Sequence, residues 1–144
     1  LFFFFFFNDT ATTEIYTFPT RRSSDLLVGR AGASTLAEAA AFGLPVVIVP
    51  YPGASGHQLA NAERVVAAGA GRLVPDERFD AAALLDAAAL LDRPAEHAAM
   101  AAAARSLARP GAAEAVAELV LALAQRRPLP EPARIERLAA GSAT

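Results

Sequence analysis

The stretch that decides the fold is LLVGRAGASTLAEAAAFGLPVVIVPYP, residues 26–52. It holds two short apolar runs, residues 26–28 and 45–50, and each is followed by a turn rich in Gly or Pro. Continuous apolar runs of this length are typical of parallel strands that are buried on both faces. Residues 33–42, between the runs, have helical composition and end at Gly43, a residue that suits the end of a helix. The stretch therefore predicts a strand–helix–strand unit.

The same alternation continues toward the C-terminus. After the loop over residues 51–56, we expect a helix, a third short strand stopped by Pro75, and three Ala-rich helices. Their predicted ranges are 57–68 for the first helix, 72–74 for the strand, and 80–91, 94–107 and 111–125 for the later helices. Strands that alternate with helices predict an α/β fold, here a partial Rossmann-like parallel sheet followed by a helical C-terminus.

The C-terminal end carries two further expectations. In the last Ala-rich helix, Ala115, Leu119 and Leu123 share one stripe, so this stripe is predicted to be buried. Beyond Arg127 the chain is rich in Pro, and residues 128–144 are predicted to form a linker or frayed tail.

Composition narrows the classes of function. The 144 residues are 54% hydrophobic and 19% charged, with a net charge of −2, which is typical of one modest globular domain. Nucleic-acid-binding domains usually show a strongly basic stripe, and this chain has no such excess of positive charge. It has no Cys, and all 13 basic residues are Arg. Thiolate metal sites, cysteine nucleophiles and lysine-based catalysis are therefore excluded.

Residues 1–25 differ sharply from the rest, because they hold seven of the nine Phe and five of the seven Thr. The segment resembles the conceptual translation of a sequencing-adapter oligonucleotide, with a frame slip after Thr17. The alternative is a genuine N-terminal strand and loop. We treat residues 1–25 as non-native and exclude them from the fold, which leaves a domain over residues 26–127. On this interpretation the chain is a fragment that begins inside a domain.

The first candidate site follows the first strand, over residues 29–38. Gly32 allows close approach of a ligand, and the helix start after it offers unpaired amides to an anion such as a diphosphate. The hydroxyls of Ser34 and Thr35 add donors, and Glu38 lies one turn further on the same face, where its carboxylate is suited to a ribose diol. The alternative is purely structural: Thr35 and Glu38 have the spacing of a capping box.

The second candidate site follows the next strand, where His57 and Gln58 open a helix and Asn61 lies one turn further. Amide and imidazole groups both donate and accept hydrogen bonds, which suits sugar hydroxyls. The alternative is that these residues cap the helix or face solvent. Ligands of parallel sheets bind outside the carboxyl ends of the strands, so both loops are expected to form one site. With two His and no Cys, we expect no metal site.

Several motifs together resemble the donor-binding C-terminal domain of the MurG family, glycosyltransferase family 28. The resemblance covers residues 26–125, in order and with family-like spacing. The motifs are RAGASTLAE (30–38), GLP (43–45), VPYP (49–52), HQLANA (57–62) and AGAG (68–71).

The resemblance implies a GT-B fold and inverting, metal-independent transfer of N-acetylglucosamine (GlcNAc) from UDP-GlcNAc to lipid I, giving lipid II. It implies no cofactor, and a location at the cytoplasmic face of the bacterial plasma membrane with peripheral attachment. The catalytic base and the lipid I site are expected in an N-terminal domain outside this chain, so the fragment is expected to be inactive alone. The implied donor-site residues are Arg30, Gly32, Ala33, Ser34, Thr35, Glu38, His57, Gln58 and Asn61.

The role of each residue in that implied site also follows from the resemblance. The helix start at residues 32–35 receives the diphosphate, Glu38 holds the ribose, and His57 and Gln58 contact the GlcNAc hydroxyls. Asn61 supports the site, and Arg30 either orders the loop or neutralises the phosphates. Two other functions stay open: a GT-B transferase for another nucleotide sugar, and a non-enzymatic interaction module built from the Ala-rich helices.

Overall fold

The computed structural model of the chain describes residues 5–7, 25–53 and 56–141. The chain divides into two compact units, Leu1–Leu107 and Ala108–Thr144. The first contains the sheet and both candidate loops, and the second is a pair of helices.

The first unit is built on a sheet with the strand order β1-β2-β3-β4. Strands β2 (Leu26–Gly29), β3 (Val46–Ile48) and β4 (Gly71–Leu73) are parallel to one another. In their register, Leu27 pairs with Val46, and Val47 pairs with Arg72. The parallel α/β sheet predicted from the sequence is therefore confirmed, with its three strands at the predicted places.

The fourth strand, β1 (Phe5–Phe7), pairs antiparallel with β2 and lies in the segment that the sequence analysis left out of the fold. An extended segment of almost any sequence can add to a free sheet edge, because the pairing uses backbone groups. The pairing therefore leaves the origin of residues 1–25 open. Most of that segment lies outside the described residues, so its likeness to adapter sequence stays a prediction.

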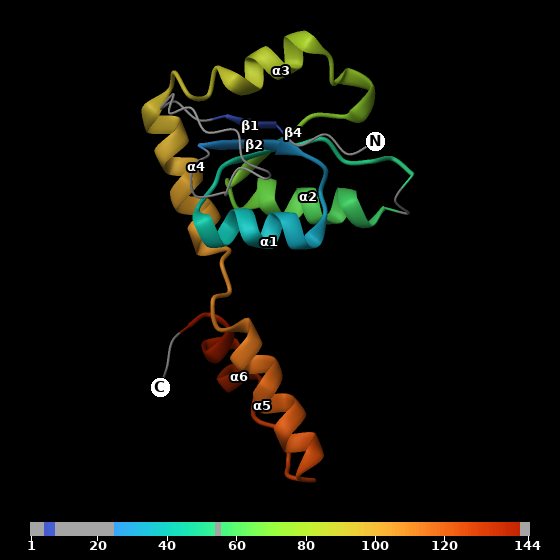
Figure 1. The fold of residues 1–144 in the computed structure, drawn as a ribbon, viewed down its shortest axis with the longest axis vertical. Coiled ribbons are helices and arrows are strands. Elements are labelled where there is room, and N and C mark those ends of the chain that lie inside the picture. Colours follow the sequence, from blue (N-terminus) through green and yellow to red (C-terminus); the bar gives the residue numbers. More distant parts are fainter. Residues whose placement is uncertain (1–4, 8–24, 54–55, 142–144) are drawn as a thin grey trace, which may run out of the picture. The chain divides into compact units, whose positions relative to one another are not determined.

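Helices cover both faces of the sheet (Figure 1). α1 (Ala33–Phe42) and α2 (His57–Ala67) lie on one face, and α3 (Ala81–Ala88) lies on the other. Because side chains alternate along a strand, each face has its own core. Leu27, Val46 and Ile48 pack toward α1 and α2. Leu26, Val28 and Val47 pack on the other face, against Ala87 of α3 and Leu90 in the turn after it.

α4 (Pro94–Ser106) lies at the end of the sheet where the strands begin (Figure 1). Its His97 Nε2 is 2.6 Å from the backbone oxygen of Asp25, the residue before β2. Met100 joins the core on the α3 face, and Ala104 joins the core on the other face. α4 therefore closes the amino end of the sheet, the end away from the two candidate loops.

Two glycines are required by this packing. Gly43 ends α1 in the left-handed conformation, with φ of 64°, and its N–H bonds the last carbonyls of the helix, as the sequence predicted. Gly71 pairs with Val46 in the sheet, and a Cβ at Gly71 would lie 2.7 Å from the backbone oxygen of Val46. The AGAG motif at residues 68–71 thus permits close packing of β3 and β4.

An ion-pair network joins β4, α3 and α4. Arg72 bonds Glu96, and Arg93 lies 3.3 Å from the other carboxylate oxygen of Glu96. Asp86 on α3 is 3.8 Å from both arginines. The hydrogen bond from Arg72, followed by that from Arg93 and the charge of both, lowers the pKa of Glu96 below its ordinary value of 4.5.

This lowered pKa predicts a pH dependence of stability. A carboxylate with a depressed folded-state pKa contributes stability above its unfolded-state pKa and loses it as the pH falls through the folded-state pKa. We expect Glu96→Gln to lower the free energy of unfolding at pH 7, and the difference from wild type to shrink below about pH 4.5. Urea titrations from pH 3 to 7 measure it, with Glu63→Gln, an exposed carboxylate on α2, as the control. A Glu96→Gln difference that stays constant across this range would contradict the prediction.

The second unit pairs α5 (Ala112–Ala124) with α6 (Pro132–Ala139). The prediction of a frayed tail over residues 128–144 is therefore wrong for α6. Pro132 sits in the first helical turn, where the fixed φ of proline favours a helix, and the residues after it are good helix formers. The backbone N–H of Gly111 donates to Ala139 at 3.1 Å, so the helix is tied back to the start of α5.

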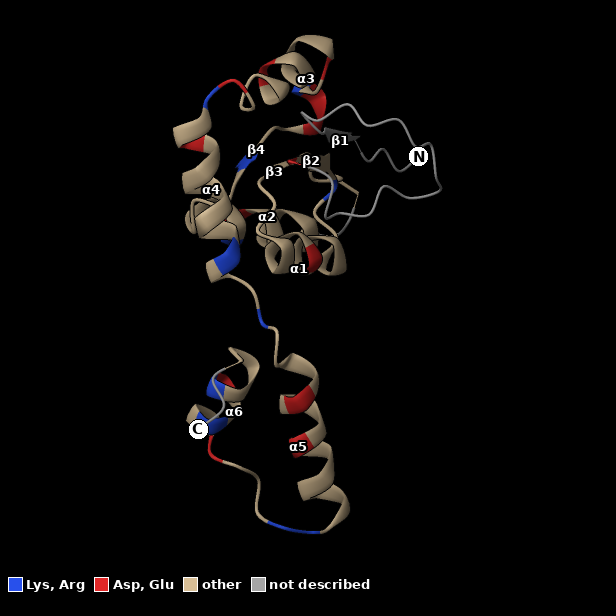
Figure 2. Ribbon diagram, turned by 60° about the vertical axis from the view of Figure 1, so that its left-hand side comes forward, with Lys and Arg blue, Asp and Glu red and all other residues tan. Residues whose placement is uncertain are grey.

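The buried stripe of α5 differs from the expected one. Ala115 and Ala122 are buried, whereas Leu123 is 65% exposed, so its predicted burial is wrong. α6 packs on α5, and Arg134 of α6 lies 3.4 Å from Glu118 of α5. Figure 2 shows α5 with acidic charged residues only and α6 with both basic and acidic residues. The packing also explains why the two units separate after Leu107 and not at residue 127, because α5 has its partner in α6.

Candidate functional site

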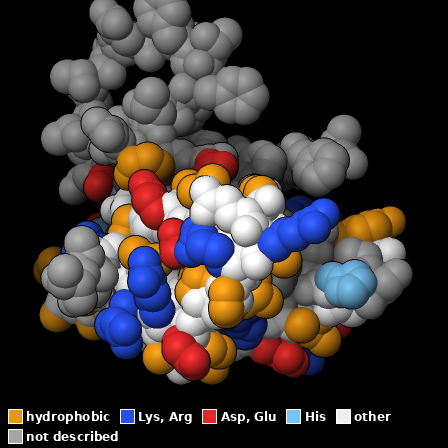
Figure 3. Space-filling model, turned by 90° about the horizontal axis from the view of Figure 1, so that it is seen from below, with side chains coloured by type: hydrophobic (Ala, Val, Ile, Leu, Met, Phe, Trp, Pro, Cys, Tyr) orange, Lys and Arg blue, Asp and Glu red, His pale blue; other side chains and the backbone are white. Residues whose placement is uncertain are grey.

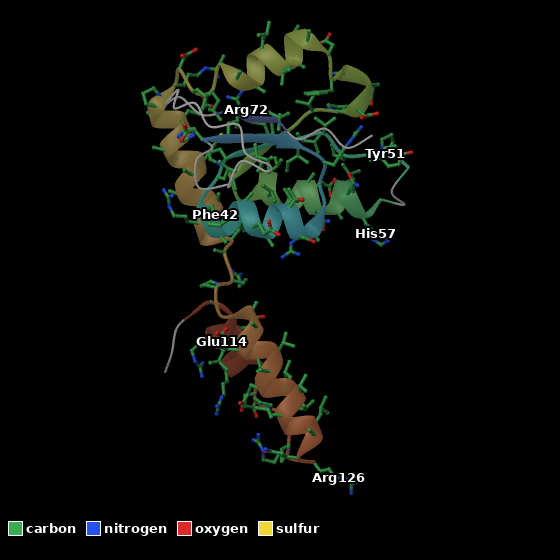
Figure 4. The ribbon with its side chains drawn as sticks, viewed as in Figure 1. Phe42, Tyr51, His57, Arg72, Glu114 and Arg126 are labelled. Atoms are coloured by element: carbon green, nitrogen blue, oxygen red, sulfur yellow. The ribbon has the colours of Figure 1, made fainter. Side chains whose placement is uncertain are left out.

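The two candidate loops leave the same edge of the sheet. Gly29, the last residue of β2, pairs with Ile48, the last residue of β3. The backbone N–H of Val49 donates to Gly29 at 2.8 Å and extends the ladder to the point where both loops begin. α1 and α2 both start at this edge: Figure 4 shows His57 at the start of α2 on the side opposite Phe42, the last residue of α1.

α1 begins without a side-chain cap. Gly32 is its N-cap residue, and this helix start has no side-chain cap hydrogen bond. The first intrahelical bond runs from Leu36 N to Gly32 O at 3.0 Å, so the amides of Ala33, Ser34 and Thr35 precede the helical ladder. The alternative that Thr35 and Glu38 form a capping box is therefore wrong, because Thr35 lies inside the first turn. The helix start keeps donors that can meet an anion.

Side-chain exposure at this helix start agrees with a surface open to a ligand. Ala33, Ser34 and Glu38 are exposed and Thr35 is half-buried. Gly32 has φ of −67°, a value open to any residue, and a Cβ there would meet nothing closer than Thr35 Oγ1 at 3.6 Å. Neither the backbone nor the packing among the described residues therefore requires a glycine at position 32.

Arg30 ties the first loop to the second. Its Nη1 donates to the backbone oxygens of Val49 at 3.1 Å and Pro50 at 3.4 Å, and it also bonds the carboxylate of Asp76. Its guanidinium lies 5.6 Å from the centre of the Tyr51 ring. Of the two roles expected for Arg30, the structure therefore supports ordering of the loop, because its charge is paired within the protein.

Asn61 and Gln58 complete the connection between the loops. Asn61 Nδ2 donates to the backbone oxygen of Ala31 at 3.1 Å, which joins α2 to the loop before α1. Gln58 Oε1 accepts from the Tyr51 backbone N–H at 2.8 Å and closes the second loop. His57 is exposed as the first residue of α2, which also starts without a side-chain cap. The predicted residues thus come from two loops that are bonded to each other.

One residue of this edge was missed by the sequence analysis, Asp76, whereas Tyr51 belongs to the predicted second loop over residues 51–56. Asp76 lies in η2 (Asp76–Arg78), the short helix that follows β4. The signal that identifies it is its position, because the carboxyl end of a third parallel strand faces the same edge as the other two. Tyr51 belongs to the VPYP motif and is 53% exposed at the mouth of the second loop.

The described residues contain no candidate metal site and no helix that could span a membrane. No group of three or more His, Cys, Asp or Glu residues lies close enough there to hold a metal ion. Within the same part of the chain, no helix has the length and apolarity that crossing a bilayer requires. On the face seen in Figure 3, basic, acidic and apolar side chains of the described residues are interspersed.

The chain is similar to a known protein family. The family described as the glycosyltransferase family 28 C-terminal domain matches residues 7–119. Two similar relatives are both called UDP-N-acetylglucosamine–N-acetylmuramyl-(pentapeptide) pyrophosphoryl-undecaprenol N-acetylglucosamine transferase. The one from Methylococcus capsulatus is 48% identical over 100 residues, 68% of this chain and 28% of the relative. The one from Moorella thermoacetica is 45% identical over 115 residues, 76% of this chain and 31% of the relative.

A solved structure agrees with these relatives. The crystal structure of MurG from Acinetobacter baumannii matches with a TM-score of 0.61 and 33% identity, over 69% of this chain and 30% of that chain. The likeness confirms the α/β fold expected from the motifs. The chain therefore spans about a third or less of the length of the relatives it matches.

Proposed function

Because the chain belongs to glycosyltransferase family 28, we propose that it forms part of the donor-binding half of a peptidoglycan N-acetylglucosaminyltransferase. The proposed reaction transfers GlcNAc from UDP-GlcNAc to lipid I, undecaprenyl-pyrophosphoryl-MurNAc-pentapeptide, and yields lipid II. The observation that carries the proposal is the bond from Asn61 to Ala31, because it joins the two loops that a single sugar nucleotide must contact together.

We assign the donor's parts to the site as follows. The uncapped start of α1, with Gly32, Ala33, Ser34 and Thr35, binds the diphosphate. The amides that precede the helical ladder and the exposed Ser34 hydroxyl support this assignment. So does the open space at position 32, where a Cβ would meet nothing closer than Thr35 Oγ1 at 3.6 Å.

We assign the ribose and the GlcNAc of the donor to side chains on α1 and α2. Glu38 accepts hydrogen bonds from the ribose hydroxyls, and His57 and Gln58 contact the GlcNAc hydroxyls. The oxygen of Gln58 holds the Tyr51 amide, so its amide nitrogen is the group that faces the sugar. Arg30 and Asn61 hold the loops in place and stay behind the ligand.

The chemistry assigned to these residues is stabilisation of the leaving group. When the bond between GlcNAc and UDP breaks, negative charge develops on the departing diphosphate. The dipole of α1 and its first amides favour that charge, and they need no reorganisation during the reaction. A helix start of this kind supports transfer without a metal ion. That the transfer inverts the anomeric configuration is proposed from the family alone.

The acceptor side of the reaction belongs to other residues. We propose that the lipid I site and the catalytic base lie in the part of such an enzyme that this chain does not span. We further propose that the enzyme works at the cytoplasmic side of the bacterial plasma membrane, as a peripheral protein.

The proposal predicts that activity depends on both parts. The 144-residue chain alone should transfer no GlcNAc when incubated with UDP-GlcNAc and a lipid I analogue. A chimeric enzyme, in which this chain replaces the matching segment of the Methylococcus capsulatus relative, should form lipid II. Radiolabelled UDP-GlcNAc measures both, and the unmodified relative is the control. Turnover by the chain alone, or a folded chimera that binds no donor, would contradict the proposal.

A further inference from the structure

A single cation links loops from three neighbouring strands at this edge. Arg30 follows β2, the two backbone oxygens that it bonds follow β3, and Asp76 follows β4. The Arg30 side chain is only 22% exposed and Asp76 is 35% exposed, so the pair is partly withdrawn from water. An ion pair in such a place is weakened less by solvent than one on the open surface.

The ion pair with Asp76 fixes the direction in which the Arg30 guanidinium points. The start of α1 lies two residues beyond Arg30 and already attracts anions. A guanidinium without a carboxylate partner in this position would be free to turn toward a bound diphosphate. With Asp76 in place, Arg30 points instead to the backbone oxygens of Val49 and Pro50 and lies over Tyr51.

We propose that Asp76 is a positioning residue of the donor site, which acts through Arg30. It holds the guanidinium between the two ligand loops and away from the phosphates. The α1 start and the Gln58 region are thereby kept at a fixed separation before the donor binds. This inference rests on the proposed function, since the site it serves is the one assigned to UDP-GlcNAc.

Two possible roles of Asp76 predict opposite changes in donor affinity when its carboxylate is removed. If Asp76 positions the loops, its removal loosens them and weakens donor binding. If it only neutralises a cation that would otherwise bind phosphate, its removal strengthens donor binding. The direction of the change in affinity therefore separates the two.

The test uses the full 144-residue chain, labelled with ¹⁵N and titrated with UDP-GlcNAc. We expect Asp76→Asn to weaken binding about five- to tenfold, to shift the Arg30 side-chain NMR signal, and to speed amide exchange at Val49. Asp76→Glu, which restores the carboxylate, should recover part of the affinity. Glu77→Gln removes the same charge from the next residue, which is exposed, and should leave the affinity unchanged.

A double-variant cycle tests whether Asp76 acts through Arg30. Adding Asp76→Asn to Arg30→Gln should cause no further loss, because the contact is already absent. Tighter or unchanged binding by Asp76→Asn, or an equal loss from Glu77→Gln, would overturn the inference while leaving the proposed function intact. Failure of the wild-type chain to bind UDP-GlcNAc would instead contradict the proposed function, and the role of Asp76 in the donor site with it.

Discussion

Replacing Glu38 by alanine is expected to raise the KM of the chimeric enzyme for UDP-GlcNAc by about 5- to 150-fold, the equivalent of about 1–3 kcal/mol. Glu38 lies on α1 one turn beyond the uncapped helix start, on the face that also carries Ser34 and Thr35. A carboxylate there can accept both hydroxyls of a ribose whose diphosphate rests on the first turn. Alanine would leave these hydroxyls without an acceptor in a site that the ligand shields from water.

Initial rates at varied UDP-GlcNAc measure this change, and the KM for lipid I should not move. Glu38→Gln keeps the size and one acceptor, so its loss should be smaller than that of Glu38→Ala. The matched control is Glu63→Ala, which removes an exposed carboxylate from the middle of α2, away from its first turn. If Glu38→Ala and Glu63→Ala gave the same donor KM as the unsubstituted chimera, Glu38 would have no role in the donor site.

Replacing Leu90 by alanine is expected to lower the free energy of unfolding by about 2–5 kcal/mol. Leu90 is fully buried on the α3 face of the sheet, where it packs in one cluster with Leu26, Val28 and Val47. Truncation removes apolar contacts and leaves a cavity that the rigid strands beneath cannot fill. Urea denaturation of the 144-residue chain, followed by circular dichroism, measures the loss.

The control for Leu90 is Leu85, which lies on α3, just before the turn that carries Leu90. Leu85 is 71% exposed, so Leu85→Ala makes the same chemical change without removing buried contacts and should change stability by less than about 0.5 kcal/mol. Equal midpoints for the two variants would mean that the α3 face holds no core. Because α3 covers the sheet from the side opposite α1 and α2, loss of this core should weaken the site indirectly, through the strands.

Elements with strong local signals were predicted with nearly correct bounds. α1 ends at Phe42 because Gly43 adopts the left-handed conformation, which glycine tolerates and most residues avoid. β3 lies inside the predicted run because its residues are apolar on both faces, as a covered parallel strand requires. Such signals act over a few residues, so they can be interpreted without the rest of the chain.

The errors arose where a local signal competes with packing. The Pro-rich composition after Arg127 suggested a tail, yet Pro132 begins α6 because α5 offers a surface for it. Leu123 shares a helical stripe with Ala115, but the folded chain buries Ala122, the residue beside it, and leaves Leu123 in solvent. The spacing of Thr35 and Glu38 suits a capping box, but the helix begins at Ala33, so the motif is out of register with the helix start.

Residue types and their order along the chain were enough to predict a parallel sheet with two polar loops at one edge, because strand direction alone brings those loops together. Folding decided which polar groups face a ligand and which hold the scaffold. Arg30 belongs to the second class because its partner Asp76, 46 residues further along, reaches it only once three strands lie side by side. A contact between residues so distant in sequence leaves no local pattern, since it exists only when the intervening chain has closed its loop.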